Sequence, residues 1–198
     1  MTAERPTKER IIDAALETLR VDGFAGASAR TIARRGDFNQ ALIFYHFGTI
    51  NDLWLAALDS TATKRRERYE EAMENATDAQ HLIEVAALLY REDLEAGHIT
   101  VLSELIAGSL TEPSLGPEIV ARMQPWIDLA EGGIARAIGG TSVEQLVRPR
   151  DLAFGLVALY LGVDLLTQLD GDRDRAESLF EVGRRLAPMM SVLRSDPS

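Results

Sequence analysis

Two amide side chains, Asn39 and Gln40, stand together at the start of a short predicted helix. The amide group of Asn or Gln can bond bidentately to the edge of an adenine in the major groove of DNA. The stretch 31–47 around them reads as a short helix, a tight turn and a second short helix, which Ile32 and Phe38 can pack together. Polar residues at the start of the second helix are typical of a DNA-reading helix-turn-helix.

The remainder of the chain is also predicted to be helical. Apolar residues recur at helical spacing throughout, and no sustained alternation of apolar and polar residues bounded by turns indicates a strand. We therefore predict an all-α fold of about nine helices. They are expected over about 7–22, 28–35, 39–46, 50–68, from 78 onward, 99–110, from the loop at 112–117 to 138, 150–169 and beyond 172, with one extra turn at 142–147.

The charge is unevenly distributed along the sequence. Residues 1–50 hold 7 Lys and Arg against 6 Asp and Glu, whereas residues 51–198 hold 14 against 25, within a net charge of −10. We predict a helix-turn-helix DNA-binding domain at 1–50 and a ligand-binding and dimerisation domain at 51–198. Because the first domain has no large basic excess, its non-specific affinity for DNA should be modest and should fall quickly with salt.

Composition argues against several other classes of protein. The longest uncharged apolar run, 152–163, is shorter than the ~18–20 residues of a membrane span, and residues 1–6 lack the apolar core of a signal peptide. Zero cysteines exclude disulfides and thiolate metal sites and fit a reducing compartment. We therefore expect a cytoplasmic protein that does not contact a membrane.

Several pieces of the N-terminal sequence, at their mutual spacing, resemble the DNA-binding domain of the tetracycline-repressor (TetR) family. The pieces are Arg10 to Ala15, Gly23-Phe24, Ile32-Ala33, the run 39–47 and Leu53. The rest of the chain is similar to the family only in length and helical character. The resemblance implies an all-helical homodimer that represses transcription at a double-stranded DNA operator until a small-molecule effector binds its C-terminal domain.

The resemblance also assigns contacts to DNA. It places phosphate contacts on Ser28 and His46, and base-reading positions on Arg30, Asn39, Gln40, Ala41 and Tyr45. Physical chemistry agrees with these roles. Ser28 at a helix N-terminus suits a phosphate, Arg30 can pair with guanine or phosphate, and Ala41 and Leu42 offer apolar contact to a thymine methyl group.

Three positions depart from the family pattern. Asp37 stands where a turn glycine is common, Phe44 stands where a tyrosine is common, and Ile50 stands where a lysine is common. Asp tolerates a left-handed backbone better than most residues, but it puts a negative charge near DNA. The other two changes remove a hydroxyl and a cation. Together they predict a weak or narrow operator rather than a changed fold.

A few polar residues interrupt the apolar helices of the C-terminal domain and are candidates for an effector site. They are Tyr90, Glu104, Trp126, Tyr160, Asp164 and Gln168. Asp164 needs a partner if it is buried, either through a hydrogen bond or ion pair at the subunit interface or on a polar or cationic group of a ligand. Trp126 can line a cavity or fill the core. The three histidines lack the spacing of a metal site, so no metal, cofactor or catalytic set is expected.

The last helix carries Leu179, Gly183, Leu186 and Met190 at intervals of four, three and four residues. That spacing is typical of a helix–helix seam, and the preceding helix, 150–169, is apolar on nearly all sides. Two such pairs from two subunits would form a four-helix interface, unless both helices simply close the core of one chain. We assign the dimer interface to Val157, Leu161, Leu179, Gly183, Leu186 and Met190.

The charged stretch 64–68 has two interpretations: a solvated helix face, or a contact to DNA or to the neighbouring domain. For the whole chain, the sequence favours a ligand-responsive DNA-binding repressor that is not an enzyme and is released from a pseudo-palindromic operator by a hydrophobic or amphipathic molecule. A helical enzyme would need a convergent acid, base or metal set. A helical adaptor would keep the fold but lose DNA binding through Asp37, Phe44 and Ile50.

Overall fold

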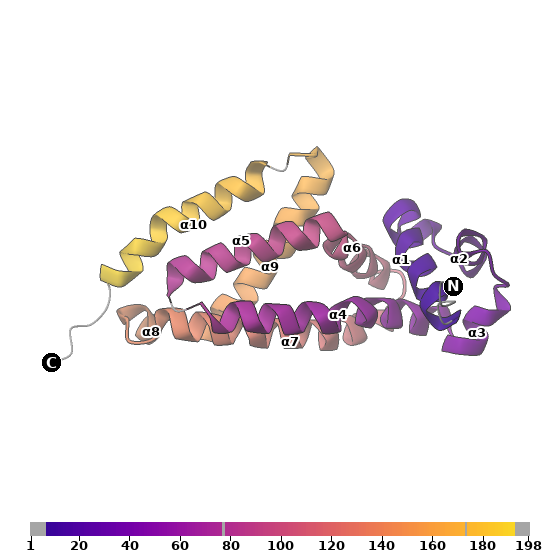
Figure 1. The fold of residues 1–198 in the computed structure, drawn as a ribbon, viewed down its shortest axis with the longest axis horizontal. Helices are drawn as coiled ribbons and strands as arrows, with labels where there is room; N and C mark the ends of the chain where they lie inside the picture. Colours follow the sequence, from indigo (N-terminus) through magenta and orange to yellow (C-terminus); the bar gives the residue numbers. More distant parts are fainter. Residues whose placement is uncertain (1–6, 77, 173, 193–198) are drawn as a thin grey trace, which may run out of the picture. The chain divides into compact units, whose positions relative to one another are not determined.

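The computed structural model describes residues 7–76, 78–172 and 174–192, in which ten helices and no strand occur (Figure 1). The predicted all-α fold is confirmed, with α8 as the predicted extra turn. The helices are α1 (Thr7–Gly26), α2 (Ala29–Gly36), α3 (Ala41–Phe47), α4 (Ile50–Glu74), α5 (Ala79–Ala96), α6 (His98–Ser109), α7 (Leu115–Ile138), α8 (Ser142–Leu146), α9 (Pro149–Asp170) and α10 (Asp174–Val192).

The chain forms two compact units that are not contiguous in sequence. The head unit comprises residues up to Lys64 together with Gly97–Arg122, and the body unit comprises Arg65–Ala96 together with residues from Met123 onward. Helices α4 and α7 therefore each contribute residues to both units, whereas α6 belongs wholly to the head unit. The domain boundary at residue 50 stays a prediction.

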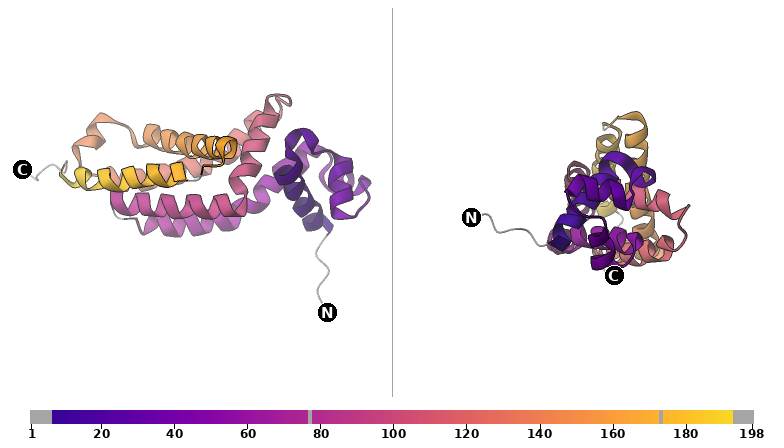
Figure 2. Two further views of the ribbon diagram at one scale, coloured as in Figure 1. Left: turned by 90° about the horizontal axis from the view of Figure 1, so that it is seen from above. Right: turned by 90° about the vertical axis from the view of Figure 1, so that its right-hand side faces the viewer.

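In the head unit, α1, α2 and α3 form one cluster, which both views of Figure 2 show in indigo and purple. Their shared core includes the fully buried side chains of Ile11, Leu19, Ile32 and Ile43. Gly23 ends the regular part of α1, as predicted, because its φ of 66° and ψ of 175° are not helical. Glycine adopts such a backbone without steric cost, unlike residues that carry a Cβ.

The break at Gly23 turns the next residue toward α6. The backbone N–H of Phe24 donates a hydrogen bond to the Glu104 carboxylate, with the nitrogen 2.7 Å from Oε2. The ring of Phe24 lies against Gly108, where an added Cβ would come within 2.5 Å of a ring carbon. A helix that is distant in sequence thus fixes the direction in which α1 ends.

In the body unit, α10 packs along α5 (Figure 1). A Cβ added at Gly183 would lie 3.2 Å from the Ile83 side chain, so this glycine lets the two helices approach closely. Further buried residues of α4, α5 and α7, including Tyr69, Leu82 and Ile134, form an apolar cluster. Burial of α5 is not complete, because Leu88 is exposed on it.

Helix α9 leaves much of its apolar surface uncovered within the chain. Phe154, Leu159 and Leu166 are all exposed, although their types favour burial. By length and composition alone, Pro149–Leu169 could cross a membrane. The same properties fit a helix that packs against another protein chain, because a large exposed apolar patch commonly marks an interface.

The contact between α1 and α6 generates a prediction about stability. Gly108→Ala should lower the free energy of unfolding by about 1–3 kcal/mol, since the new methyl group must displace the Phe24 ring. Gly116→Ala in α7 is the matched control, because a Cβ there meets nothing within 4 Å. Thermal and urea unfolding of the two variants check this. Equal stability of both variants would show that Phe24 is free to move away.

Candidate nucleic-acid interface and effector site

The first helix of the helix-turn-helix begins at a capping serine. The Ser28 hydroxyl accepts a hydrogen bond from the backbone N–H of Thr31 at 3.2 Å, and Ser28 itself has an extended backbone. This hydroxyl satisfies one of the amides that a helix N-terminus leaves unpaired. Ser28 and Arg30 are both exposed, so the assigned phosphate and base contacts are sterically open.

The turn between α2 and α3 has the conformation that the sequence demands. Asp37 has φ 51° and ψ 57°, a left-handed backbone that costs a non-glycine residue energy. The N–H of the next residue, Phe38, donates a hydrogen bond to the Ala33 carbonyl at 3.0 Å, which folds the chain back onto the end of α2. A Cβ at Gly36 would lie 2.2 Å from the Phe38 ring, so Gly36 makes room for the aromatic residue that joins the two helices.

The side chains of Asn39 and Gln40 at the start of α3 differ in their hydrogen bonds. The Asn39 side-chain oxygen accepts from the backbone N–H of Ala41 at 2.9 Å, which shapes the start of the helix. Gln40 is exposed at the N-cap position and makes no side-chain capping bond. The Asn39 side chain must break its hydrogen bond with the Ala41 amide before it can bond bidentately to a base. The Gln40 side chain has no capping bond to break.

The aromatic end of α3 projects from the head unit. Tyr45 is 82% exposed, and its ring meets the His46 ring edge-on with centroids 5.0 Å apart. Phe44, which lacks the common hydroxyl, is also exposed. Ala41 is exposed, whereas Leu42 and His46 are half-buried. Of the predicted DNA-binding residues, Ala41, Leu42, Tyr45 and His46 thus lie on α3, and Asn39 and Gln40 directly precede it.

Not every arginine of the motif is available for DNA. Arg35 donates to the Asp22 carboxylate at 2.9 Å and to the Thr18 hydroxyl at 3.1 Å, so it ties α2 to α1. Arg10 donates to the Gly36 carbonyl at 3.4 Å. Sequence reasoning did not assign these structural roles, because each partner lies more than ten residues away along the chain.

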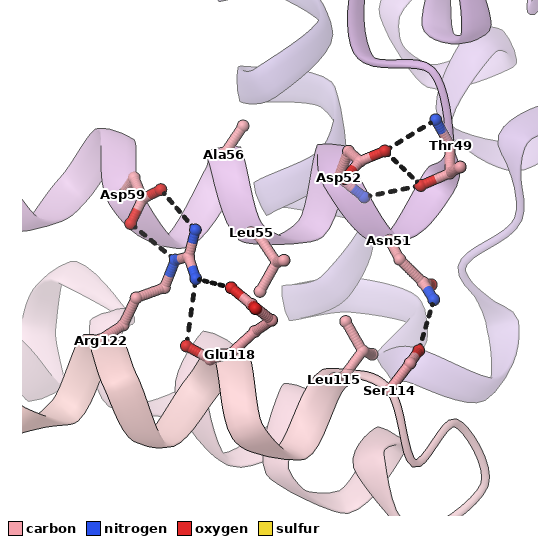
Figure 3. Close-up of a pocket in the computed structure, with 10 residues that line it drawn as sticks. All are labelled: Thr49, Asn51, Asp52, Leu55, Ala56, Asp59, Ser114, Leu115, Glu118 and Arg122. Carbon is pink, nitrogen blue, oxygen red and sulfur yellow. Dashed lines mark hydrogen bonds and ion pairs between the residues drawn. The ribbon is translucent and has the colours of Figure 1, made fainter.

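The start of α4 is held against the start of α7 within the head unit (Figure 3). Thr49 and Asp52 form a reciprocal capping arrangement, in which each side chain accepts from the backbone N–H of the other residue. Arg122 donates to both oxygens of Asp59, at 2.9 and 3.1 Å, and to Glu118. Although burial alone would lower it, these bonds raise the pKa of Arg122 above its usual value.

An open cleft of about 540 Å³ lies between these two helix segments. Figure 3 shows its lining, with the Arg122 guanidinium between the two carboxylates. None of the six effector candidates from the sequence lines this cleft. One of them, Glu104, lies elsewhere in the head unit and accepts from the Phe24 amide. The other five candidates belong to the body unit.

Three of those five candidates surround an ion pair that the sequence did not reveal. Asp93, with its side chain 3% exposed, forms a short contact with Arg65, whose side chain is 22% exposed. The Tyr160 hydroxyl donates to the same carboxylate oxygen, and Tyr90 meets the Tyr160 ring edge-on at 5.2 Å. The Arg65 guanidinium lies over the Trp126 ring at 4.9 Å. We refer to Arg65, Tyr69, Asp93, Trp126 and Tyr160 as the Asp93 cluster.

The charges of this cluster are fixed by their surroundings. Burial opposes ionisation of Arg65, but attraction to Asp93 outweighs it and raises the pKa of Arg65 above its usual value. Burial, followed by the charge of Asp93, raises the pKa of Tyr160 far above its usual range. The Tyr160 hydroxyl consequently remains a proton donor to Asp93 at physiological pH.

The other two candidates, Asp164 and Gln168, lie one and two helical turns beyond Tyr160 on α9. Asp164 is fully buried, and its Oδ2 accepts from the Gln168 side chain. Asp164 was one of the candidates that the sequence singled out, whereas Asp93 was missed. The signal for Asp93 was present, because it continues the buried stripe of Leu82 and Leu89 on α5 at helical spacing. Among the described residues, no group of three His, Cys, Asp or Glu side chains could hold a metal ion.

Comparisons with known proteins agree with this geometry. Residues 11–57 match the family described as bacterial regulatory proteins, tetR family. The resemblance predicted from the sequence is thereby confirmed: the chain has a helix-turn-helix and the fold of a TetR-family transcription regulator. Comparison with curated protein sequences gives no match.

Solved structures extend the similarity over nearly the whole chain. A putative TetR-family transcriptional regulator from Rhodococcus sp. is 20% identical, with a TM-score of 0.76 and coverage of 95% of this chain and 98% of that one. A TetR-family member from Streptomyces coelicolor A3 is 27% identical, with a TM-score of 0.64 and coverages of 92% and 99%. The multidrug binding protein EbrR, complexed with proflavin, is 28% identical, with a TM-score of 0.61 and coverages of 90% and 98%.

The difference in hydrogen bonding between Asn39 and Gln40 generates a prediction. Gln40→Ala should reduce discrimination between specific and scrambled duplexes by about 1–3 kcal/mol, the value of a bidentate contact to a base. Asn39→Ala should cost less discrimination, since part of its effect falls on the Ala41 amide and hence on the helix itself. Fluorescence anisotropy with both duplexes checks this. Equal losses on specific and scrambled DNA would indicate backbone contacts instead.

Proposed function

We propose that this protein is a ligand-responsive DNA-binding repressor that binds a pseudo-palindromic operator as a homodimer and is released by a small hydrophobic or amphipathic molecule. The observation that carries the proposal is the family match over residues 11–57, in which Gln40 at the N-cap of α3 and Tyr45 on α3 are exposed. Such a helix fits the major groove, which is wide enough to admit it. Its compartment is the cytoplasm, where its DNA lies.

Binding of a small molecule to the body unit is supported by two observations. The Asp93 cluster combines aromatic rings with a few directed polar groups, as ligand sites commonly do. EbrR, at 28% identity, is a multidrug binding protein whose structure holds proflavin. We place the effector contacts on Tyr90, Trp126 and Tyr160, with Asp164 and Gln168 next to them on α9. The protein acts by binding rather than by catalysis.

The experiment that tests the proposal is salt-dependent binding to DNA from the protein's own promoter region. Specific binding to a palindrome there, with an affinity that falls as salt increases, is expected of a regulator that contacts several phosphates. A helical adaptor that has lost DNA binding through Asp37, Phe44 and Ile50 would bind neither the promoter DNA nor a scrambled duplex at low salt. That result would overturn the proposal.

The homodimer is proposed to form through α9 and α10. Leu179 and Leu186 are exposed, and Val157 and Leu161 are half-buried, which suits a partner chain. Gly183 has a different position, because it faces Ile83 of the same chain. The side chain of Met190 lies outside the described residues. Two reading heads in one dimer match the paired half-sites of a palindromic operator.

Leu186→Glu should therefore convert the dimer to a monomer and abolish operator binding, since a charge would be buried at the proposed interface. Leu110→Glu is the control, because Leu110 is 84% exposed at the end of α6 in the head unit. Sedimentation velocity measures the oligomeric state of both variants. A Leu186→Glu variant that remains a dimer would place the interface on another surface.

A further inference from the structure

The Asp93 cluster has an unusual composition for a ligand site, because the chain supplies its own cation. Asp93 lies on α5, Arg65 on α4, Trp126 on α7 and Tyr160 on α9. A buried carboxylate requires a positive partner or several donors, and here it has both. The guanidinium sits 4.9 Å from the centre of the Trp126 ring and 5.7 Å from that of the Tyr69 ring. These are distances at which an aromatic face attracts a cation.

We infer that Arg65 occupies the recognition site of an organic cation, and that the effector is a planar, delocalised cation that displaces the Arg65 guanidinium from Asp93. This inference rests on the proposed function and names the effector's class. Any molecule that takes this position must bring a positive charge and N–H donors for Asp93. It must also offer a flat surface to Trp126 and Tyr69. An amidinium or guanidinium on an aromatic body meets all three requirements.

Three features make the exchange physically reasonable. Arg65 is partly exposed and has a long flexible stem, so its head can move to water without unfolding α4. The Tyr160 hydroxyl continues to donate to Asp93 while the cation is exchanged. Residues 65–96 and 123–198, which make up the body unit, hold 12 Lys and Arg against 20 Asp and Glu, so the body attracts cations and repels anions.

Displacement of Arg65 from Asp93 would act on α4, the helix that directly follows the helix-turn-helix. Helix α4 begins at Ile50, shortly after α3 ends, and Arg65 is the first residue of α4 that belongs to the body unit. The bond between Arg65 and Asp93 holds α4 to α5 at that point. A cation that takes Asp93 removes this bond. Effector binding therefore selects conformations in which α4 is held differently, provided that the cation binds them more tightly.

The test measures the affinity of the full-length protein for benzamidinium by calorimetry, with neutral benzamide as the matched probe. Arg65→Ala should bind benzamidinium at least tenfold more tightly than the unmodified protein, because no internal guanidinium has to be displaced. Asp93→Asn should bind it at least tenfold more weakly. Arg68→Ala is the control, since Arg68 lies on α4 like Arg65 but is exposed and pairs with Glu92. The affinity of this variant for benzamidinium should equal that of the unmodified protein.

Circular dichroism verifies that each variant is folded. If Arg65→Ala is not folded, Arg65→Gln replaces it, because glutamine keeps much of the stem that packs on the rings. The inference is overturned if the folded Arg65 variant binds benzamidinium no more tightly than the unmodified protein. It is equally overturned if benzamide binds as well as benzamidinium, because the site would then not recognise charge.

A separate measurement distinguishes this inference from the proposed function. Promoter DNA is titrated with the unmodified protein, with and without saturating benzamidinium. Release of bound DNA by benzamidinium but not by benzamide supports a cationic effector. Failure to bind any DNA defeats the proposed function, while the calorimetric comparison still decides whether Arg65 occupies a cation site. Tight binding without release overturns the regulatory part of the inference.

Discussion

The body unit depends on one buried carboxylate, Asp93. Arg65 compensates its charge inside the protein, and breaking such a pair by removing one partner commonly costs about 3–5 kcal/mol. Four helices meet around it: α5 carries the carboxylate, α4 the cation, α9 a hydroxyl that donates to the carboxylate, and α7 an aromatic ring against the cation. A polar group of this kind specifies how the helices pack more strictly than apolar contacts, which many arrangements can satisfy.

The head unit solves a different problem, which is how to hold short helices in place. Helices α2 and α3 have eight and seven residues, too few to be stable alone in water. Their order comes from caps and close contacts, such as the Ser28 hydroxyl, the left-handed Asp37 and the Phe38 ring over Gly36. In each case the type of residue suits it to that local conformation or contact. The head unit is therefore specified largely by neighbours in sequence.

That difference explains what could be predicted from the sequence. The helix-turn-helix was recognisable because Ser28, Gly23 and the run 39–47 act within a few residues of their own positions. Asp93 and its partner are 28 residues apart, and Glu104 and Phe24 are 80 apart. Helical periodicity places a residue on a buried face, but it does not say which residue of another helix will meet it. For the same reason Gly183 was assigned to a seam between two subunits, although it faces Ile83 of the same chain.

The interleaving of the two units has a consequence for how this protein could have diversified. A piece ending at Lys64 would lack α6, and with it the carboxylate that holds Phe24 and the buried side chains of Ile99, Val101 and Leu105. Recombination at a single point therefore cannot transfer the DNA-binding helices to a different effector-binding domain without loss of these contacts. A successful chimaera must carry over α6 and the start of α7, or must rebuild an equivalent surface. Point substitutions in the body unit, unlike exchange of whole segments, leave the contacts between α1 and α6 intact.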